Sequence, residues 1–196
     1  AVADIALACV RALGGRCFVL TTTLRALQQV GAQLQEALSA EGIDVLVQGQ
    51  SPKRALMQRF LGQGADLGRR GAVLVGSQSF WEGIDVPGDA LQCVVIDKLP
   101  FPPPNDPLVE ARVKKLEGEG RNAFNDYFVA EAAVSLKQGA GRLIRSETDR
   151  GLLVVCDSRL ATMSYGRRLL AALPPMALAG SREEALAWLA ELAASH

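Results

Sequence analysis

The sequence is poor in the residues on which several kinds of active site depend. Its single histidine is His196, at the end of the chain, which excludes histidine-based catalytic triads and histidine-ligated metal sites. The four cysteines form no C-x-x-C pair, so we expect reduced, buried thiols and no metal site within this chain. No apolar run reaches the roughly 18 residues that a membrane span needs, so no membrane partner is expected.

The charges balance, with 21 Lys and Arg residues against 21 Asp and Glu residues. No overall basic field therefore marks a nucleic-acid partner, and any such contact must come from a local patch. The length of 196 residues fits one domain with a sizeable core. The start, Ala1-Val2-Ala3-Asp4, lacks both a methionine and the features of a secretion signal. We therefore expect a cytoplasmic protein and a chain excised from a longer one.

Short runs rich in β-branched residues alternate with amphipathic stretches along the chain. Strands are predicted at 16–20, 44–47, 72–75, 92–96 and 151–156, and helices at 24–38, from 52, from 107, around 129–145, at about 165–173 and from 181. This alternation predicts an α/β fold whose mainly parallel sheet carries helices on both faces. In such sheets ligands bind at the carboxyl ends of the strands.

The helix predicted to end near residue 145 places Gln138, Arg142 and Arg145 on one face, because their spacing is i, i+4, i+7. The opposite face is apolar, with Val129, Ala133, Leu136 and Ala140. Two arginines held in this way suit the charge on a transferring phosphoryl group. The alternative is an ordinary amphipathic helix with a solvated basic end.

Gly139 and Gly141 interrupt the same helix. Each costs a helix up to ~1 kcal/mol relative to alanine. Two glycines beside a charge cluster therefore suggest that something approaches closely, and the phosphates of a nucleotide would fit.

Two predicted strands end in polar residues. The first runs into Thr21-Thr22-Thr23 and then Leu24-Arg25, which would suit a phosphate bound at a helix N-terminus. Helix capping by Thr22 or Thr23 alone is an equal alternative.

The third strand runs into the segment 76–88, which contains Ser77, Ser79, Phe80 and Trp81. Its aromatic side chains could stack on a base or fill a gap in the core, and we favour core packing. Glu82 and Asp85 flank Gly83, where a backbone can approach a ligand, so we favour a functional role for that part.

Together these segments resemble a known family. Residues 76–88, with Glu-Gly-Ile-Asp at 82–85, resemble helicase motif V, and 138–145, Q-x-x-G-R-x-I-R, resembles motif VI. Residues 18–22 match the family's motif at the start of this domain in position, and the Pro-rich connection 99–107 is close to the family's connection after the next strand. The ordered set resembles the second RecA-like motor domain of superfamily 2 DNA helicases of the DinG/XPD-like (Rad3-related) group, nearest to the bacterial DinG/YoaA-like branch.

The resemblance implies that residues 1–196 form a single RecA-like domain, one half of a motor that holds ATP between two such domains. Arg142 and Arg145 would reach the γ-phosphate, and Gln138 would couple that site to the domain interface. Contacts with the nucleotide are implied for Glu82, Gly83, Asp85 and Gly141. Contacts with single-stranded DNA, along which the motor would move 5′→3′, are implied for Thr21, Thr22, Thr23, Arg25, Ser77, Ser79 and Trp81.

The sequence also departs from a complete motor. No G-x-x-x-x-G-K-[ST] and no Asp-Glu dipeptide occur, so the phosphate loop and the Mg²⁺-binding acidic motif are absent. Mg²⁺ and any iron–sulfur cluster would belong to the N-terminal motor domain of the same protein. Two alternatives remain open: a stand-alone nucleic-acid-binding module, and a Rossmann-like enzyme. The latter lacks G-x-G-x-x-G after its first strand.

Overall fold

The computed structural model describes residues 1–62, 71–81, 84, 86, 88–144 and 148–195, and for Gln78 and Trp81 the backbone only. The chain divides into two compact units. The first unit comprises Ala1–Lys98, Arg142–Cys156 and Ala177–His196, and the second comprises Leu99–Gly141 and Asp157–Met176. Each unit is described by itself below.

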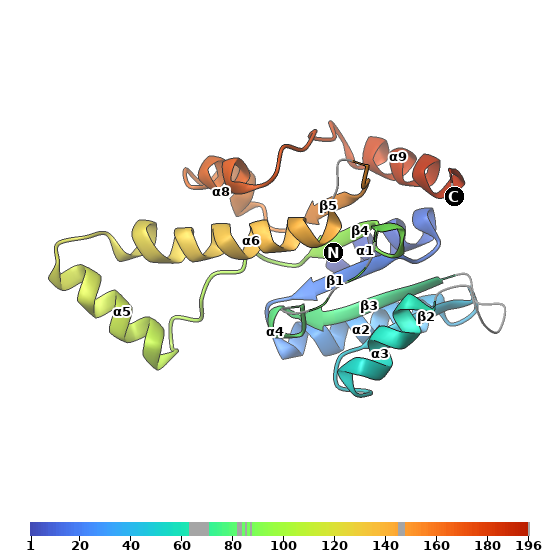
Figure 1. Cartoon of the computed structure of the whole chain (residues 1–196), viewed down its shortest axis with the longest axis horizontal. Coiled ribbons are helices and arrows are strands. Elements are labelled where there is room, and N and C mark those ends of the chain that lie inside the picture. The colour runs from blue at the N-terminus through green and yellow to red at the C-terminus, as the bar shows by residue number, and fades with distance from the viewer. Residues whose placement is uncertain (63–70, 82–83, 85, 87, 145–147, 196) are drawn as a thin grey trace. The chain divides into compact units, whose positions relative to one another are not determined.

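The first unit is built on a five-stranded sheet in the order β2-β3-β1-β4-β5 (Figure 1). All four strand pairs are parallel. The strands are β1 (Cys17–Thr21), β2 (Ile43–Val47), β3 (Gly71–Ser77), β4 (Cys93–Ile96) and β5 (Leu152–Val155). The predicted strands and the predicted α/β class are therefore confirmed, with strand ends shifted by one or two residues.

Helices cover both faces of this sheet. On one face α1 (Val2–Leu13), α2 (Leu24–Leu38) and α9 (Arg182–Ala194) share a core with inward-facing residues such as Val19, Val73 and Val95. On the other face Phe18 meets Phe60 of α3 (Lys53–Leu61), with ring centroids 4.7 Å apart. The short α4 (Gln78–Trp81) follows β3 directly. Burial on both sides explains why β4 is apolar throughout.

Polar side chains cap the starts of α2, α5 (Pro107–Gly118) and α9. Thr23 Oγ1 accepts a hydrogen bond from Ala26 N at 3.1 Å, and Ser181 Oγ accepts one from Glu184 N at 3.1 Å. Asp106 caps α5 by accepting from the first backbone N–H groups of that helix. The predicted starts at 107 and 181 are confirmed. Helix α1 was not predicted.

The second unit is helical. It contains α5, a π-helical turn at Phe124–Phe128, most of α6 (Val129–Leu143), α7 (Arg159–Thr162) and α8 (Gly166–Ala172). Its aromatic side chains form one cluster with centroid distances of 5.4–6.2 Å, made by Phe101, Phe124, Tyr127, Phe128 and Tyr165. Helix α6 crosses the boundary, since Arg142 and Leu143 belong to the first unit.

The packing of α2 on β2 depends on Gly31. A Cβ at this position would lie 2.9 Å from Val47 Cγ2, which is buried. Alanine favours a helix by up to ~1 kcal/mol, but overpacking costs ~1–3 kcal/mol. We expect Gly31→Ala to lower the free energy of unfolding by about 1 kcal/mol in urea titrations.

The matched control for this prediction is Gly118→Ala at the end of α5, where an added Cβ meets nothing within 4 Å. This variant should not lose stability. Stabilisation by both substitutions would show that α2 and β2 are not in close contact at Gly31.

Candidate functional site

The carboxyl ends of the strands bring polar residues from distant parts of the sequence to one edge of the first unit. Thr21 of β1 is the register partner of Ser77 of β3. Gln48 follows β2 directly, and Asp97 follows β4 directly. The predicted threonine and serine positions are thus neighbours, and two further polar residues flank them that were not predicted.

Asp97 is the most buried carboxyl of this edge, with 4% of its surface exposed. Its Oδ1 accepts the Thr22 N–H at 3.0 Å, and its Oδ2 accepts the Thr22 hydroxyl at 3.3 Å. Burial raises the pKa of the Asp97 carboxyl, while the bonds from Lys98 and Thr22 oppose that rise. Asp97 therefore ties the start of the threonine turn to the end of β4.

The other two threonines use their side chains differently. Thr21 is buried, at 2% exposure, and its hydroxyl lies 3.3 Å from the Thr23 carbonyl oxygen. Thr23 is exposed and caps α2 with its oxygen, so Thr23, and not Thr22, is the cap of this helix. In a helix cap the hydroxyl oxygen accepts a hydrogen bond, and the hydroxyl proton is not used. A capping threonine therefore still has a proton to donate to a ligand.

Gln48 plays a comparable part at the end of β2. Its Oε1 accepts the Ser77 N–H at 2.7 Å and the Ser77 hydroxyl at 3.0 Å. Ser77 Oγ is also 3.0 Å from the hydroxyl oxygen of Ser79, which is exposed. One amide thus orients both predicted serine contacts.

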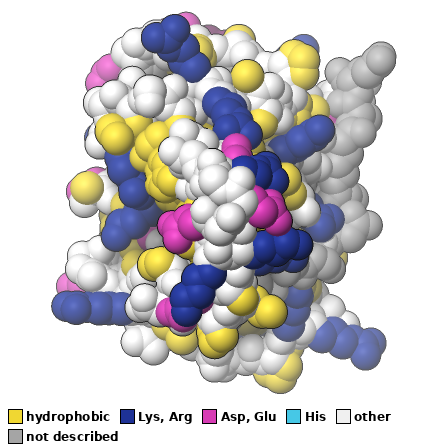
Figure 2. All heavy atoms as spheres, turned by 90° about the vertical axis from the view of Figure 1, so that its left-hand side faces the viewer, with side chains coloured by type: hydrophobic (Ala, Val, Ile, Leu, Met, Phe, Trp, Pro, Cys, Tyr) yellow, Lys and Arg dark blue, Asp and Glu magenta, His cyan; other side chains and the backbone are white. Residues whose placement is uncertain are grey.

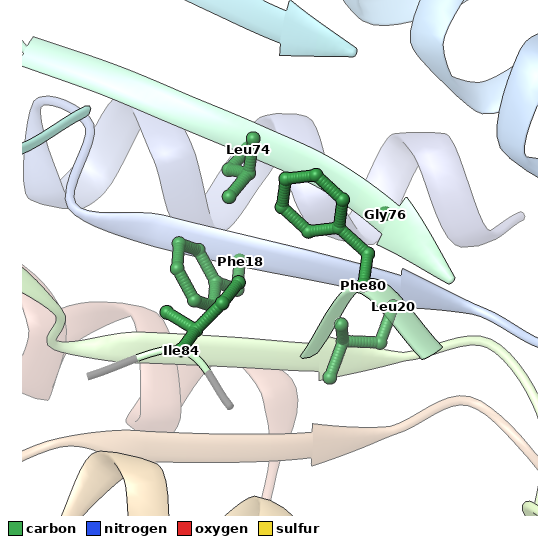
Figure 3. Close-up of a pocket in the computed structure, with 6 residues that line it drawn as sticks. All are labelled: Phe18, Leu20, Leu74, Gly76, Phe80 and Ile84. Carbon is green, nitrogen blue, oxygen red and sulfur yellow. The ribbon is translucent and has the colours of Figure 1, made fainter. Parts of the chain in front are cut away.

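The segment after β3 is anchored by apolar side chains. Phe80 is 7% exposed and packs against Gly76, where a Cβ would lie 3.2 Å from the Phe80 ring. Figure 3 shows Phe80 and Ile84 over the strand residues Phe18, Leu20 and Leu74, which line a small apolar recess with them. Core packing of Phe80 is therefore confirmed. Glu82, Gly83, Asp85 and the side chain of Trp81 lie outside the described residues.

Basic side chains stand at the starts of two helices that follow strand ends. Arg25 lies at the start of α2, and Lys53 and Arg54 open α3; all three are exposed. Lys53 Nζ lies 5.2 Å from the centre of the Phe80 ring. Figure 2 shows exposed Lys and Arg side chains interspersed with apolar and acidic ones. The basic residues thus supply local positive charge in a chain with no net charge.

Helix α6 carries the predicted arginine face only in part within the described residues. Gln138 is exposed and Arg142 is half-buried, while Arg145 lies outside the described residues. Among the residues that the structure describes, no hydrogen bond or ion pair engages the Arg142 guanidinium. A Cβ at Gly141 would meet nothing within 4 Å, so packing among the described residues does not require that glycine.

The buried stripe of α6 differs from the prediction at one position. Ala132 is fully buried, whereas the predicted Ala133 is only half-buried. The other buried members are Val129, Leu136, Ala140 and Leu143.

An ion pair organises the second unit just after β5. The Asp157 side chain is 7% exposed and accepts the Leu99 N–H at 3.0 Å. Arg159 Nη2 lies 2.7 Å from Asp157 Oδ2, and the guanidinium lies 5.4 Å from the centre of the Phe101 ring. The bond from Arg159 lowers the pKa of Asp157 to about 2.

Other kinds of site find no support in the described part of the chain. Its His, Cys, Asp and Glu residues form no cluster that could hold a metal ion. All four cysteines are free thiols, and burial raises the pKa of Cys156 to about 11. None of the described helices has the length and apolar character needed to cross a membrane.

The family is decided by the extent of the sequence match. A family model described as "Helicase C-terminal domain" matches residues 6–176. The chain belongs to the helicase C-terminal domain family. This helicase C-terminal domain is similar to curated proteins named as ATP-dependent helicases, which agrees with the DinG/XPD-like resemblance in the sequence.

Two relatives are named YoaA and DinG. The domain is 43% identical over 166 residues to the "ATP-dependent DNA helicase YoaA" of Escherichia coli K12, covering 85% of this chain and 25% of that protein. It is 41% identical over 166 residues to the "ATP-dependent helicase DinG" of Mycobacterium tuberculosis H37Rv, covering 85% and 24%. The helicase C-terminal domain thus spans about a quarter of the length of these relatives.

Solved structures support the fold. A chain titled "XPD_Helicase" aligns with a TM-score of 0.59 at 18% identity, over 90% of this chain and 31% of that one. "Structure of S. tokodaii Xpd4" aligns with a TM-score of 0.54 at 17% identity, over 89% and 34%. The helicase C-terminal domain therefore shares a RecA-like fold with helicases of this group.

The Asp157–Arg159 pair predicts a loss of stability in acid. The folded pKa of Asp157, about 2, is below the unfolded value of 3.8, so its stabilisation is present above pH 4 and is lost as the pH falls toward 2. The shift corresponds to about 2 kcal/mol. Asp157→Asn should be less stable than the unmodified chain at pH 6 and lose less between pH 4 and pH 2 in denaturant titrations.

The control for this prediction is Glu117→Gln, an exposed carboxylate of the same unit. It should follow the unmodified chain at both pH values. An Asp157→Asn variant that parallels the unmodified chain from pH 6 to pH 2 would show that Asp157 has no depressed pKa.

Proposed function

We propose that this chain is the second motor domain of an ATP-dependent DNA helicase that translocates 5′→3′ along single-stranded DNA. The observation that carries the proposal is the helicase C-terminal domain match over residues 6–176. It is supported by the names of the relatives, which are ATP-dependent helicases of whose length the match to this chain covers about a quarter. The direction of movement rests on the DinG/XPD-like resemblance alone.

In this proposal Arg142 acts on ATP as an arginine finger. Its guanidinium engages no other described residue, as expected for a group that acts on a phosphoryl oxygen outside the chain. Arg145 has the same role, Gln138 couples the nucleotide site to the domain interface, and Gly141 leaves room for the phosphates. Glu82, Gly83 and Asp85 approach the nucleotide from the segment after β3.

The ATP phosphates and Mg²⁺ are held mainly by the N-terminal motor domain of the same protein. This assignment is supported by the sequence, which has no G-x-x-x-x-G-K-[ST] and no Asp-Glu pair. Any iron–sulfur cluster is likewise held outside this chain. This chain supplies arginine side chains to the reaction, and the N-terminal motor domain supplies the phosphate loop.

Single-stranded DNA follows the carboxyl edge of the sheet. The phosphates lie along the turn Thr21–Thr23, Ser77, Ser79, Arg25 and Trp81; because Thr21 is buried, its hydroxyl does not itself reach them. Exposed hydroxyls and helix N-termini are typical phosphate contacts in nucleic-acid complexes. The exposed Arg25, Lys53 and Arg54 at this edge support an anionic ligand.

The arginine-finger role predicts a specific kinetic defect. In the full-length protein, Arg142→Ala should lower kcat for DNA-stimulated ATP hydrolysis about 10³-fold, because a finger stabilises the transition state. The affinity for single-stranded DNA should change little. Steady-state ATPase assays and fluorescence anisotropy measure the two quantities.

Lys137→Ala is the matched control, because Lys137 is an exposed cation on the same helix and should leave kcat unchanged. A loss confined to DNA affinity in Arg142→Ala would contradict the finger role.

A second prediction concerns the chain by itself. Without a phosphate loop, the purified 196-residue chain should not hydrolyse ATP measurably, with or without single-stranded DNA, whereas the full-length protein should. Phosphate release assays at equal molar concentrations make the comparison. DNA-stimulated turnover by the isolated chain would refute the two-domain motor.

A further inference from the structure

The threonine turn after β1 has three hydroxyls, and each has one proton to donate. An ionised carboxylate only accepts hydrogen bonds, so the Thr22 hydroxyl, 3.3 Å from Asp97 Oδ2, directs its proton inward. The Thr21 hydroxyl donates to the Thr23 carbonyl oxygen, also at 3.3 Å. Two of the three protons are therefore used inside the protein.

Thr23 is different from its two neighbours. Its oxygen accepts the Ala26 N–H, and among the described residues no acceptor is bound to its own proton. Its side chain is exposed, as is that of Arg25 two residues later. The first backbone N–H groups of α2, at Leu24 and Arg25, have no partner within the helix. The Thr23 hydroxyl and these two backbone N–H groups are therefore hydrogen-bond donors that remain available at the start of α2.

The placement of Thr23 depends on Asp97. Through its two bonds to Thr22, the buried carboxyl fixes both the backbone and the side chain of the residue before the cap. A negative charge beside a phosphate site is unfavourable in itself. The negative charge of Asp97 is compatible with a phosphate site if the gain in affinity from ordering the turn is larger than the loss from this repulsion.

We propose that Asp97 is a positioning residue for nucleic-acid binding, and that it holds Thr22 so that Thr23, not Thr22, donates the hydroxyl hydrogen bond to a backbone phosphate. This inference rests on the proposed function, because it assumes that a nucleic acid strand follows this edge. It narrows the predicted contacts of Thr21, Thr22 and Thr23 to one donor and assigns a role to a residue outside the predicted set.

The test measures the affinity of the full-length protein for a fluorescent single-stranded oligothymidylate by anisotropy, at one fixed salt concentration. Thr22→Ala and Thr23→Ala each remove one hydroxyl from adjacent exposed positions. We expect Thr23→Ala to raise Kd about tenfold, the worth of a hydrogen bond to a charged group, and Thr22→Ala to raise it less than about threefold. Thr23→Ser keeps both cap and donor and should bind like the unmodified protein.

The role of Asp97 is tested by whether its replacement tightens or weakens binding of the oligonucleotide. Removing a negative charge near phosphates should tighten binding if electrostatics alone matter, whereas loss of positioning should weaken it. We expect Asp97→Ala to raise Kd several-fold, and Asp97→Asn, which still accepts the Thr22 N–H, to bind within about threefold of the unmodified protein. In a Thr23→Ala background, Asp97→Ala should add little, because the donor it positions is already gone.

The outcomes separate the two proposals. Tighter or unchanged binding by Asp97→Ala, full additivity with Thr23→Ala, or an equal loss in Thr22→Ala and Thr23→Ala would overturn the positioning role and leave the helicase proposal intact. An unmodified full-length protein that binds no single-stranded oligonucleotide would overturn both. Melting temperatures of all variants, measured in parallel, identify any loss of affinity that only follows unfolding.

Discussion

The hydrogen bonding of a parallel sheet is the constraint on which the rest of this structure depends. All four strand pairs are parallel, so every strand of the first unit ends at the same edge. The register that pairs Thr21 with Ser77 also places Ile96, and therefore Asp97, beside β1. Residues that the chain separates by more than fifty positions become neighbours because the backbone must satisfy its own donors and acceptors.

At that edge, the buried Asp97 and the half-buried Gln48 determine what neighbouring hydroxyl groups can do. Asp97 accepts hydrogen bonds from the backbone N–H and the hydroxyl of Thr22, and Gln48 accepts the same pair from Ser77. Each of these acceptors therefore controls the direction of a hydroxyl that would otherwise rotate. Because the chain has no net charge, the proposed binding of an anionic strand would depend on the orientation of such donors and on a few basic residues at helix starts.

Much of the fold could be predicted from the sequence because its signals are local. Apolar runs such as 93–96 reveal strands buried on both faces, and Asp106-Pro107 and Ser181 mark helix starts. Helix α1 was missed although Ala6, Cys9, Val10 and Leu13 follow a helical spacing; that signal could have found it. In α6, Ala132 and Ala133 are adjacent alanines, and only the neighbouring elements decide which is buried.

The candidate site was predictable only where several residues form a motif. The threonine triplet and the polar segment after β3 stand out in the sequence, whereas Asp97 and Gln48 are single polar residues after strands. Their importance comes from bonds to residues 75 and 29 positions away, and no local pattern contains that information. The division into two units likewise depends on contacts between distant segments.

The contact between the two ends of the chain has a consequence for synthesis. Helix α1 packs against α9, and Leu189 and Leu192 belong to the same buried cluster as Ala6 and Val10. A ribosome makes α1 near the start and α9 at the end of these 196 residues. One apolar side of α1 therefore stays uncovered until almost the whole segment has left the exit tunnel. During that interval the nascent chain exposes a surface on which chaperones can act and through which unfinished molecules can associate.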